Sequence, residues 1–289
     1  MVNFSAKSKL VGVFSSLALL AACGSNTQSD SSDLKVVDGL EIPYTTDPSV
    51  VFIYNLAQEG EGGSVCTGTF VQPQLLLTAA HCTEYISNQA GRGLNEELED
   101  EILILDWDET IDTDDDPSNG ISGGFKRIAT SSRIFRHPSI NRRNIATVTS
   151  NDLAILYFED YVSEATTPIA SAQPRRGETA TIIGFGADSI RPAADDDSVG
   201  TKRKGTITIG GVSNFITFRG PSRTTCRTDC GIDVNSGPGD SGGPMLVDGE
   251  LVGVTSGGSF FSSSYVNINS RASRAFLDSV SATLEQPIR

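Results

Sequence analysis

The sequence Gly237-Pro238-Gly239-Asp240-Ser241-Gly242-Gly243-Pro244 places one serine among four glycines. Glycine tolerates a positive φ and adds no side chain, so the backbone can turn sharply around Ser241 and leave two N–H groups unobstructed. A nucleophilic serine needs such donors facing the developing oxyanion, a base that takes its proton, and a carboxylate that orients the base. This octapeptide therefore predicts a serine nucleophile if the chain also supplies a base and an acid.

Both partners occur upstream, each at the edge of an apolar run. Thr78-Ala79-Ala80-His81-Cys82 carries one of only two histidines directly after a predicted strand, and Asn151-Asp152-Leu153-Ala154-Ile155-Leu156 places an acid at the start of another. Taken singly, each motif has a structural explanation: a hydrogen-bonding histidine, a capping aspartate, and a serine in a turn. Taken together, in the order His81, Asp152, Ser241, they indicate nucleophilic catalysis.

Short runs rich in Val, Ile, Leu, Phe and Thr, separated by Gly, Pro, Asn and Asp, predict strands along most of the chain. These strands are expected at residues 50–54, 64–70, 74–78, 153–158, 179–184, 205–209, 244–247 and 250–255. Residues 270–284 alone have a helical pattern, with Ala272, Ala275, Phe276, Val280 and Leu284 near one face. The fold class predicted from these patterns is all-β and antiparallel, ending in one helix.

The three motifs TAAHC (78–82), DLAIL (152–156) and GDSGGP (239–244) closely resemble those of the trypsin/chymotrypsin-like serine peptidase family, and they occur in the family's order. Weaker matches at residues 66–70, 183–186 and 253–258 extend the resemblance from about residue 36 to the C-terminal helix. The resemblance implies two packed six-stranded antiparallel β-barrels, residues 36–162 and 163–289, with the active site in the cleft between them.

The resemblance also implies a role for each site residue. Ser241 would attack the scissile carbonyl, His81 would act as general base and then general acid, and Asp152 would orient the imidazole. The N–H groups of Gly239 and Ser241 would form the oxyanion hole. Ser256 is expected to support Asp152, and the backbone of Gly258 is expected to pair with an extended substrate strand. The second histidine, His137, is assigned a structural role because the base is already accounted for.

Disulfide pairing follows from the same resemblance. Cys66 lies on the segment that brings the partner of the cysteine after the catalytic histidine, so a bridge from Cys66 to Cys82 is implied. Cys226 and Cys230 are then expected to pair with each other, and two other pairings of the four cysteines remain open. The family often has a further bridge from the residue four before the nucleophile, but here that position is Gly237 and no cysteine follows Ser241.

The specificity pocket departs from the trypsin pattern. Counting back six residues from Ser241 reaches Asn235, where trypsin-like enzymes have the aspartate that binds Arg or Lys. We expect a neutral pocket lined by Asn235 and Ser236. Asp233 is the alternative if the loop gap lies elsewhere, and Thr255 stands where glutamate-specific relatives tend to have His.

Residues 34–39, Leu-Lys-Val-Val-Asp-Gly, resemble the family's activation site. Cleavage after Lys35 would expose the ammonium of Val36, which would insert and pair with Asp240, thereby ordering the oxyanion loop. The departure is Asp38, where the family commonly has Gly.

The N-terminus has the layout of an export signal. Lys7 and Lys9 precede an apolar run, and the sequence Leu20-Ala21-Ala22-Cys23 resembles a bacterial lipobox. We predict a signal peptide at 1–22, acylation of Cys23, and a tether or propeptide at 23–35. This lipoprotein would be located at the outer membrane, or be periplasmic or secreted after release. A plain signal peptide is the alternative.

Acidic residues are concentrated in one segment. The formal charge is −14, from 22 Lys and Arg against 36 Asp and Glu, which argues against nucleic acid or anionic membrane partners. Twelve of the acids lie between Asn95 and Asp116, where no Lys or Arg occurs. The segment is predicted to be a solvated loop, or alternatively a Ca²⁺ site. No cofactor is otherwise expected.

Three functions from different classes follow. The favoured hypothesis is an active, monomeric serine endopeptidase that acts on proteins or peptides and touches the membrane only through its lipid. The second is a non-catalytic binding or adhesion lipoprotein on the same fold, which should have lost a triad residue. The third is an acidic Ca²⁺-binding lipoprotein in which the segment 95–116 carries the function.

Overall fold

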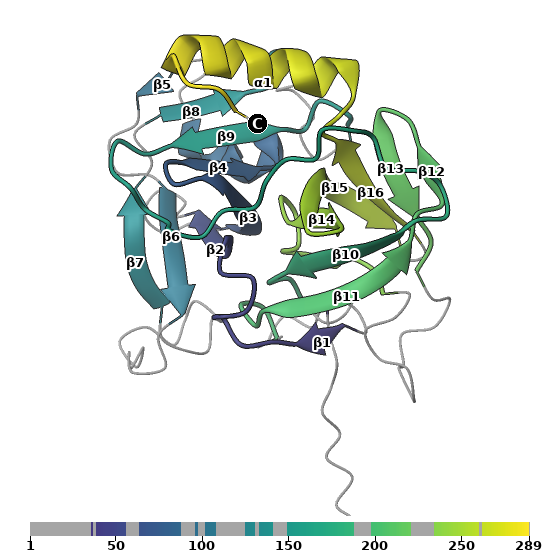
Figure 1. Ribbon diagram of the computed structural model, residues 1–289. Coiled ribbons are helices and arrows are strands. Elements are labelled where there is room, and N and C mark those ends of the chain that lie inside the picture. Colours follow the sequence, from purple (N-terminus) through teal and green to yellow (C-terminus); the bar gives the residue numbers. More distant parts are fainter. Residues whose placement is uncertain are drawn as a thin grey trace, which may run out of the picture. The chain divides into compact units, whose positions relative to one another are not determined.

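Two antiparallel sheets and one C-terminal helix make up the described part of the computed structural model (Figure 1). The structure describes residue 36 and residues 39–55, 64–87, 96–97, 102–107, 125–130, 133–140, 149–187, 198–220, 234–259 and 262–288. The predictions for Cys23, Lys35, Cys226 and Cys230 concern residues outside these ranges.

The N-terminal sheet has the strand order β5-β8-β9-β4-β3-β2-β6-β7. Its strands are β2 (Val50–Asn55), β3 (Ser64–Gln72), β4 (Leu75–Thr78), β5 (Glu96–Glu97), β6 (Ile102–Trp107), β7 (Phe125–Thr130), β8 (Arg133–Arg136) and β9 (Ala154–Tyr157). β4 is buried along its whole length and pairs with β3 on one side and β9 on the other. A short 3₁₀ helix, η1 (Ala80–Ser87), follows β4.

The C-terminal sheet has the strand order β1-β11-β10-β14-β15-β16-β13-β12. Its strands are β1 (Leu40–Glu41), β10 (Thr179–Gly184), β11 (Arg203–Thr208), β12 (Gly211–Val212), β13 (Phe215–Phe218), β14 (Pro244–Val247), β15 (Glu250–Ser259) and β16 (Ser262–Asn267). β1 precedes the whole N-terminal sheet in the chain, yet it pairs with β11 of the C-terminal sheet. Leu40 and Glu41 are therefore fixed to the second half of the molecule.

The predicted fold class is confirmed: the protein is mostly β, with two antiparallel sheets and a C-terminal helix. Each sheet has eight strands where six per barrel were expected. Two-residue strands at the sheet edges, β1, β5 and β12, account for most of the difference, because without them the C-terminal sheet has six strands and the N-terminal sheet has seven.

One apolar cluster joins the two sheets and the helix. It contains Phe52 and Leu77 from the N-terminal sheet, Ile183 and Val254 from the C-terminal sheet, and Phe276 from the helix. Each of these side chains is nearly or fully buried, which contributes about 1.5–3 kcal/mol of transfer free energy per large side chain. The cluster therefore holds both sheets together at the junction where the candidate site lies.

The helix α1 (Arg271–Leu284) begins after Ser270, whose side chain caps it by accepting a hydrogen bond from the Ser273 N–H. The predicted helix is confirmed, but its predicted buried face is partly wrong. Ser273, Phe276, Leu277 and Val280 are buried, whereas Ala275 is exposed. A polar residue can occupy the buried face because the Ser273 hydroxyl accepts a hydrogen bond from the cap Ser270.

The acidic segment is not one continuous loop, which corrects the prediction for residues 95–116. Within it, Glu96–Glu97 forms β5 and pairs with β8, and Ile102–Trp107 forms β6 and pairs with both β2 and β7. The apolar run Ile102-Leu103-Ile104-Leu105 favours this strand despite the surrounding carboxylates. The Ca²⁺ hypothesis stays a prediction because its central carboxylates, Asp112, Asp114 and Asp116, lie outside the described residues.

Within the described part of the chain, no helix has the length and apolar character needed to span a membrane.

Candidate active site

His81 and Asp152 are brought together by two paired strands. β4 ends at Thr78, opposite Ala154 at the start of β9, so the residues that follow β4 and precede β9 lie at the same end of the sheet. The Asp152 carboxylate accepts two hydrogen bonds from His81, one from the backbone N–H at 2.9 Å and one from Nδ1 at 2.6 Å. The backbone bond fixes the position of the carboxylate, and the side-chain bond fixes the plane of the imidazole.

Asp152 is almost completely buried, with 1% of its surface exposed. It accepts a third hydrogen bond, at 2.7 Å, from the hydroxyl of Ser256 on β15. A carboxylate without hydrogen bonds would be costly to bury, and these three donors offset that cost. Because an ionised carboxylate can only accept, His81 carries its proton on Nδ1 in this arrangement, which leaves Nε2 as a base. The expected support of Asp152 by Ser256 agrees with this contact.

Ser241 lies in a loop whose backbone only glycine can follow. Gly239 and Gly242, on either side of the serine, have φ values of +94° and +82°. A Cβ atom on Gly242 would lie 2.1 Å from Thr78 Oγ1 and 2.2 Å from the Thr67 carbonyl oxygen. The loop is therefore packed directly against the N-terminal sheet although the following strand, β14, belongs to the C-terminal sheet.

Two N–H groups of this loop are available for a ligand. Within the described residues, neither Gly239 N–H nor Ser241 N–H donates a hydrogen bond, whereas the neighbouring N–H groups of Asp240 and Gly242 bond to Gly237 and Thr255. Two unpaired backbone donors separated by one residue, in a glycine-rich loop beside a serine, are the form that an oxyanion hole takes. These are the two donors that the sequence predicted.

The disulfide predicted between Cys66 and Cys82 is confirmed. It also connects His81 to the serine loop: a ring nitrogen of His81 lies within 4.8 Å of Cys82 Sγ, and that sulfur lies 3.5 Å from the Ser241 carbonyl oxygen. Cys66, His81 and Cys82 form the single group of potential metal ligands found among the described residues. The disulfide occupies both sulfurs, so these residues do not fit a metal site.

A cavity of about 240 Å³ adjoins Ser241. Among the described residues, its lining contains glycines, hydroxyl side chains and one proline, and no charged residue: Ser236, Gly237, Pro238, Ser241, Thr255, Gly257, Gly258 and Ser259. Ser236 and Gly258, two of the four predicted substrate-binding residues, are part of this wall. The cavity has room for one side chain of a substrate.

Asn235 is not among the residues that line this cavity. Its side chain is buried, with Nδ2 donating to the Ser259 carbonyl oxygen at 3.2 Å and Oδ1 accepting from the Ser263 hydroxyl. The Ser263 oxygen also accepts from the backbone N–H of Ser236 at 3.1 Å and from its hydroxyl at 2.6 Å. Ser263 was not singled out in the sequence, because nothing in the polar run Ser262-Ser263-Ser264 marks the middle serine.

Asp240 is buried behind the serine loop. Its carboxylate accepts hydrogen bonds from the N–H groups of Gly186, at 2.8 Å, and Gly237, at 2.7 Å. Burial raises the pKa of this carboxyl group to about 6, while the two N–H groups and the charge of Arg203 act in the opposite direction. Val36 is also buried, in the apolar cluster that contains Ile182 of β10.

His137 has the structural surroundings that were predicted for it. Its ring is buried against Phe276 of α1, with 5.5 Å between ring centroids, and its Nδ1 accepts a hydrogen bond from the Ser139 N–H at 3.2 Å. Burial lowers its pKa, and a backbone hydrogen bond to Ala272 partly offsets this effect. His137 thus packs the helix onto the sheet.

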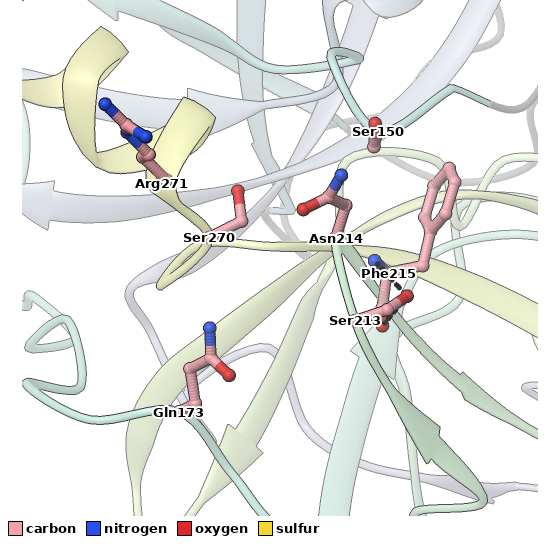
Figure 2. Close-up of a pocket in the computed structure, with 7 residues that line it drawn as sticks. All are labelled: Ser150, Gln173, Ser213, Asn214, Phe215, Ser270 and Arg271. Carbon is pink, nitrogen blue, oxygen red and sulfur yellow. Dashed lines mark hydrogen bonds between the residues drawn. The ribbon is translucent and has the colours of Figure 1, made fainter.

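A larger hollow, of about 610 Å³, lies elsewhere, where the start of α1 meets the turn between β12 and β13 (Figure 2). The part of its lining that the structure describes is polar with one aromatic ring and one charged side chain, Arg271: the residues are Ser150, Gln173, Ser213, Asn214, Phe215, Ser270 and Arg271. None of them is a predicted catalytic residue, so the smaller cavity beside Ser241 is the candidate active site.

Thr67 is a supporting residue that the sequence reasoning missed. Its N–H donates to the Ser241 carbonyl oxygen at 2.8 Å, and its hydroxyl lies 3.1 Å from the Gly239 carbonyl oxygen. Thr67 lies on β3, so these bonds tie the serine loop to the N-terminal sheet. Its position beside Cys66, in a segment that resembles the family, is the sequence signal that could identify it.

Comparisons with known proteins agree with this geometry. Residues 36–275 match the family model described as Trypsin. The chain is 26% identical to prostatic glandular kallikrein-6 of Rattus norvegicus, over 84% of this chain and 87% of the relative. It is also 26% identical to kallikrein-4 of Homo sapiens, over 86% and 85% of the two chains. It is 25% identical to a trypsin of Saccharopolyspora erythraea, over 68% and 77%. The family model covers most of the chain, and the protein belongs to the trypsin family of serine peptidases.

Proposed function

We propose that this protein is a serine endopeptidase whose catalytic residues are Ser241, His81 and Asp152. The observation that carries the proposal is the buried Asp152 carboxylate, held by three donors and bonded to His81 Nδ1 at 2.6 Å, beside a serine loop with two unused N–H groups. A histidine with a purely structural role would not require a nearby serine loop with two unpaired N–H groups.

The reaction follows from the roles of these groups. Ser241 Oγ attacks the scissile carbonyl carbon while its proton passes to His81 Nε2, and the carbonyl oxygen becomes an oxyanion facing the N–H groups of Gly239 and Ser241. His81 then protonates the leaving amine, and an acyl-enzyme remains on Ser241. Water, deprotonated by His81, cleaves this ester and releases the carboxylic acid. Asp152 stabilises the imidazolium that forms in each step.

The preferred substrate residue at the cut is proposed to be uncharged. Support comes from the cavity beside Ser241, whose described lining carries no charge, and from Asn235, whose amide is engaged by Ser259 and Ser263. A Lys or Arg side chain would bury its cation there without a carboxylate partner among these residues, which is costly. Gly258 would pair with the backbone of an extended substrate.

Activation is proposed to occur by cleavage after Lys35. The new ammonium of Val36 would then pair with Asp240. Support comes first from the burial of both residues. It comes also from β10, which lies close to each of them: a Cβ atom on Gly184 would lie 2.1 Å from Asp240 Oδ1, and Ile182, two residues earlier, shares an apolar cluster with Val36. The same cleavage would release the enzyme from a lipid on Cys23. N-terminal sequencing of active protein tests this step, and an active form that begins at Cys23 would exclude it.

Peptide-library cleavage by protein processed at Lys35 tests the proposed function. We expect cuts after uncharged residues, and complete loss of cleavage in Ser241→Ala with unchanged folding. Ser279→Ala, on the helix far from the motifs in sequence, is the matched serine control and should keep full activity. Turnover by Ser241→Ala would show that the nucleophile is misassigned, and inactivity of the processed parent protein would favour the binding hypothesis.

A further inference from the structure

A buried arginine, Arg203, lies behind the serine loop and has no role in the reaction described above. It is the first residue of β11, which runs beside β10 in the C-terminal sheet (Figure 1). Only 1% of its surface is exposed. Its Nη1 donates to the Gly186 carbonyl oxygen at 2.7 Å, and its Nη2 lies 3.5 Å from Glu41 Oε1. Burying a guanidinium is costly, so its contacts merit a functional interpretation.

The Gly186 carbonyl belongs to the same peptide group as the Ala187 N–H. That N–H donates to the Pro238 carbonyl oxygen at 2.7 Å. The Pro238 carbonyl in turn belongs to the same peptide group as the Gly239 N–H, which is one of the two oxyanion donors. A continuous line of hydrogen bonds therefore runs from the Arg203 guanidinium through two peptide groups to the Gly239 N–H.

The packing along this line leaves little freedom. A Cβ atom on Gly186 would lie 2.6 Å from the Pro238 carbonyl oxygen and 2.6 Å from the Asp240 nitrogen, and one on Gly239 would lie 2.8 Å from the Gly186 Cα. The turn that holds Gly186 is thus in direct backbone contact with the oxyanion loop. A change in the direction of the Gly186 carbonyl must also move the Pro238–Gly239 peptide.

We propose that Arg203 is a positioning residue for the oxyanion hole, which orients and polarises the Gly239 N–H through the Gly186–Ala187 and Pro238–Gly239 peptides. Hydrogen bonds in a chain polarise one another, and a cation at the donor end strengthens the last N–H in the series. The stabilisation is greatest when negative charge develops on the substrate oxygen. This inference rests on the proposed peptidase function.

Lys202 provides a matched control because it is the adjacent residue and is equally buried, with 1% exposed. Its Nζ donates to the carbonyl oxygens of Thr46 and Asp47, at 2.7 and 2.8 Å, in the turn between β1 and β2. It also lies 5.6 Å from the centre of the Phe185 ring, beside Gly186. If loss of a buried cation merely loosens this region, replacing Lys202 should therefore impair the enzyme as much as replacing Arg203.

The test compares Arg203→Met, Arg203→Lys and Lys202→Met in processed enzyme, with a peptide ester substrate and a peptide boronate as transition-state analogue. Removing an oxyanion donor outright costs about 100- to 1000-fold in kcat, and removing a residue that orients one should cost about tenfold. We expect this loss in Arg203→Met with KM unchanged within twofold, a parallel tenfold weakening of boronate binding, and substantial recovery in Arg203→Lys. Lys202→Met should keep kcat within twofold.

Three results would overturn the inference: an unchanged kcat in Arg203→Met, a loss of kcat without weaker boronate binding, or an equal loss in Lys202→Met. If Arg203→Met does not fold, Arg203→Gln retains an N–H donor without the charge and is judged by the same criteria. An inactive parent enzyme would instead refute the peptidase function, so the two failures can be told apart.

Discussion

The buried carboxyl group of Asp240 should make stability depend on pH in a way that a single substitution removes. We consider Asp240→Asn in a chain that also carries Lys35→Gln, to block cleavage, and Ser241→Ala, to prevent self-digestion. Both oxygens of Asp240 accept backbone N–H groups. An asparagine can accept only one of these bonds through its single carbonyl oxygen, so the variant has a cost that does not depend on pH.

The pH-dependent part of the stability difference acts in the opposite direction, because it disfavours the protein that keeps Asp240 as the pH rises. Burial raises the pKa of Asp240 from 3.8 to about 6 in the native state. The native protein therefore holds this proton more tightly than the unfolded chain does. The resulting stabilisation is complete below about pH 3.8 and is lost as the pH rises through 6. At about 1.4 kcal/mol for each pKa unit, the loss is on the order of 3 kcal/mol.

Denaturant unfolding between pH 4.5 and 8 measures this effect as the difference in unfolding free energy between the two proteins. The unfolding free energy of Asp240→Asn should increase relative to that of its parent as the pH rises, with roughly two-thirds of the full change falling inside this interval. In the chain cleaved after Lys35, the Val36 ammonium should lower the Asp240 pKa and reduce the shift. Parallel stability curves for the uncleaved pair would refute the reasoning about Asp240.

Three other experiments test separate parts of the structure. Ser256→Ala removes a 2.7 Å hydrogen bond to the buried carboxylate beside the imidazole, so steady-state kinetics should show kcat about tenfold lower with KM unchanged; an unaltered kcat would contradict the assigned role. Replacing both Cys66 and Cys82 by alanine opens a bridge between residues 16 apart and should lower the unfolding free energy by about 3 kcal/mol, and a loss below about 1 kcal/mol would contradict this. Gly242→Ala should lower the melting temperature far more than Gly249→Ala. Both positions have φ near +80°, but only at Gly242 would a Cβ atom meet backbone and side-chain oxygens. Equal melting temperatures of the two variants would argue against the close packing of the serine loop on the N-terminal sheet.

Most of the fold could be predicted where a strand carries its own apolar pattern. β10 and β14 have the predicted bounds, and β4 differs by one residue. β16, Ser262–Asn267, could not be predicted because its sequence is half serine; it forms because β15 and β13 flank it on both sides. β6 is difficult to predict because acidic residues flank its four consecutive apolar residues.

The candidate site, like the fold, could be predicted only in part. His81, Asp152 and Ser241 could be located because each lies in a motif whose residue types are demanded by chemistry. Asn235 could be located by counting, but its orientation depends on Ser263, which lies 28 residues later and meets it only in the folded chain. Arg203 could not be found from sequence, since its importance comes from the Gly186 carbonyl that it contacts.

The central claim is that Ser241 is an activated nucleophile in the folded enzyme. Its most direct test is labelling of processed protein with a serine-directed peptidyl phosphonate, followed by mass analysis of the peptide that contains Ser241. We predict one adduct per molecule, located on Ser241, formed by the native protein and lost after unfolding or in Asp152→Ala. Folded, processed protein that forms no adduct on Ser241 would contradict the account.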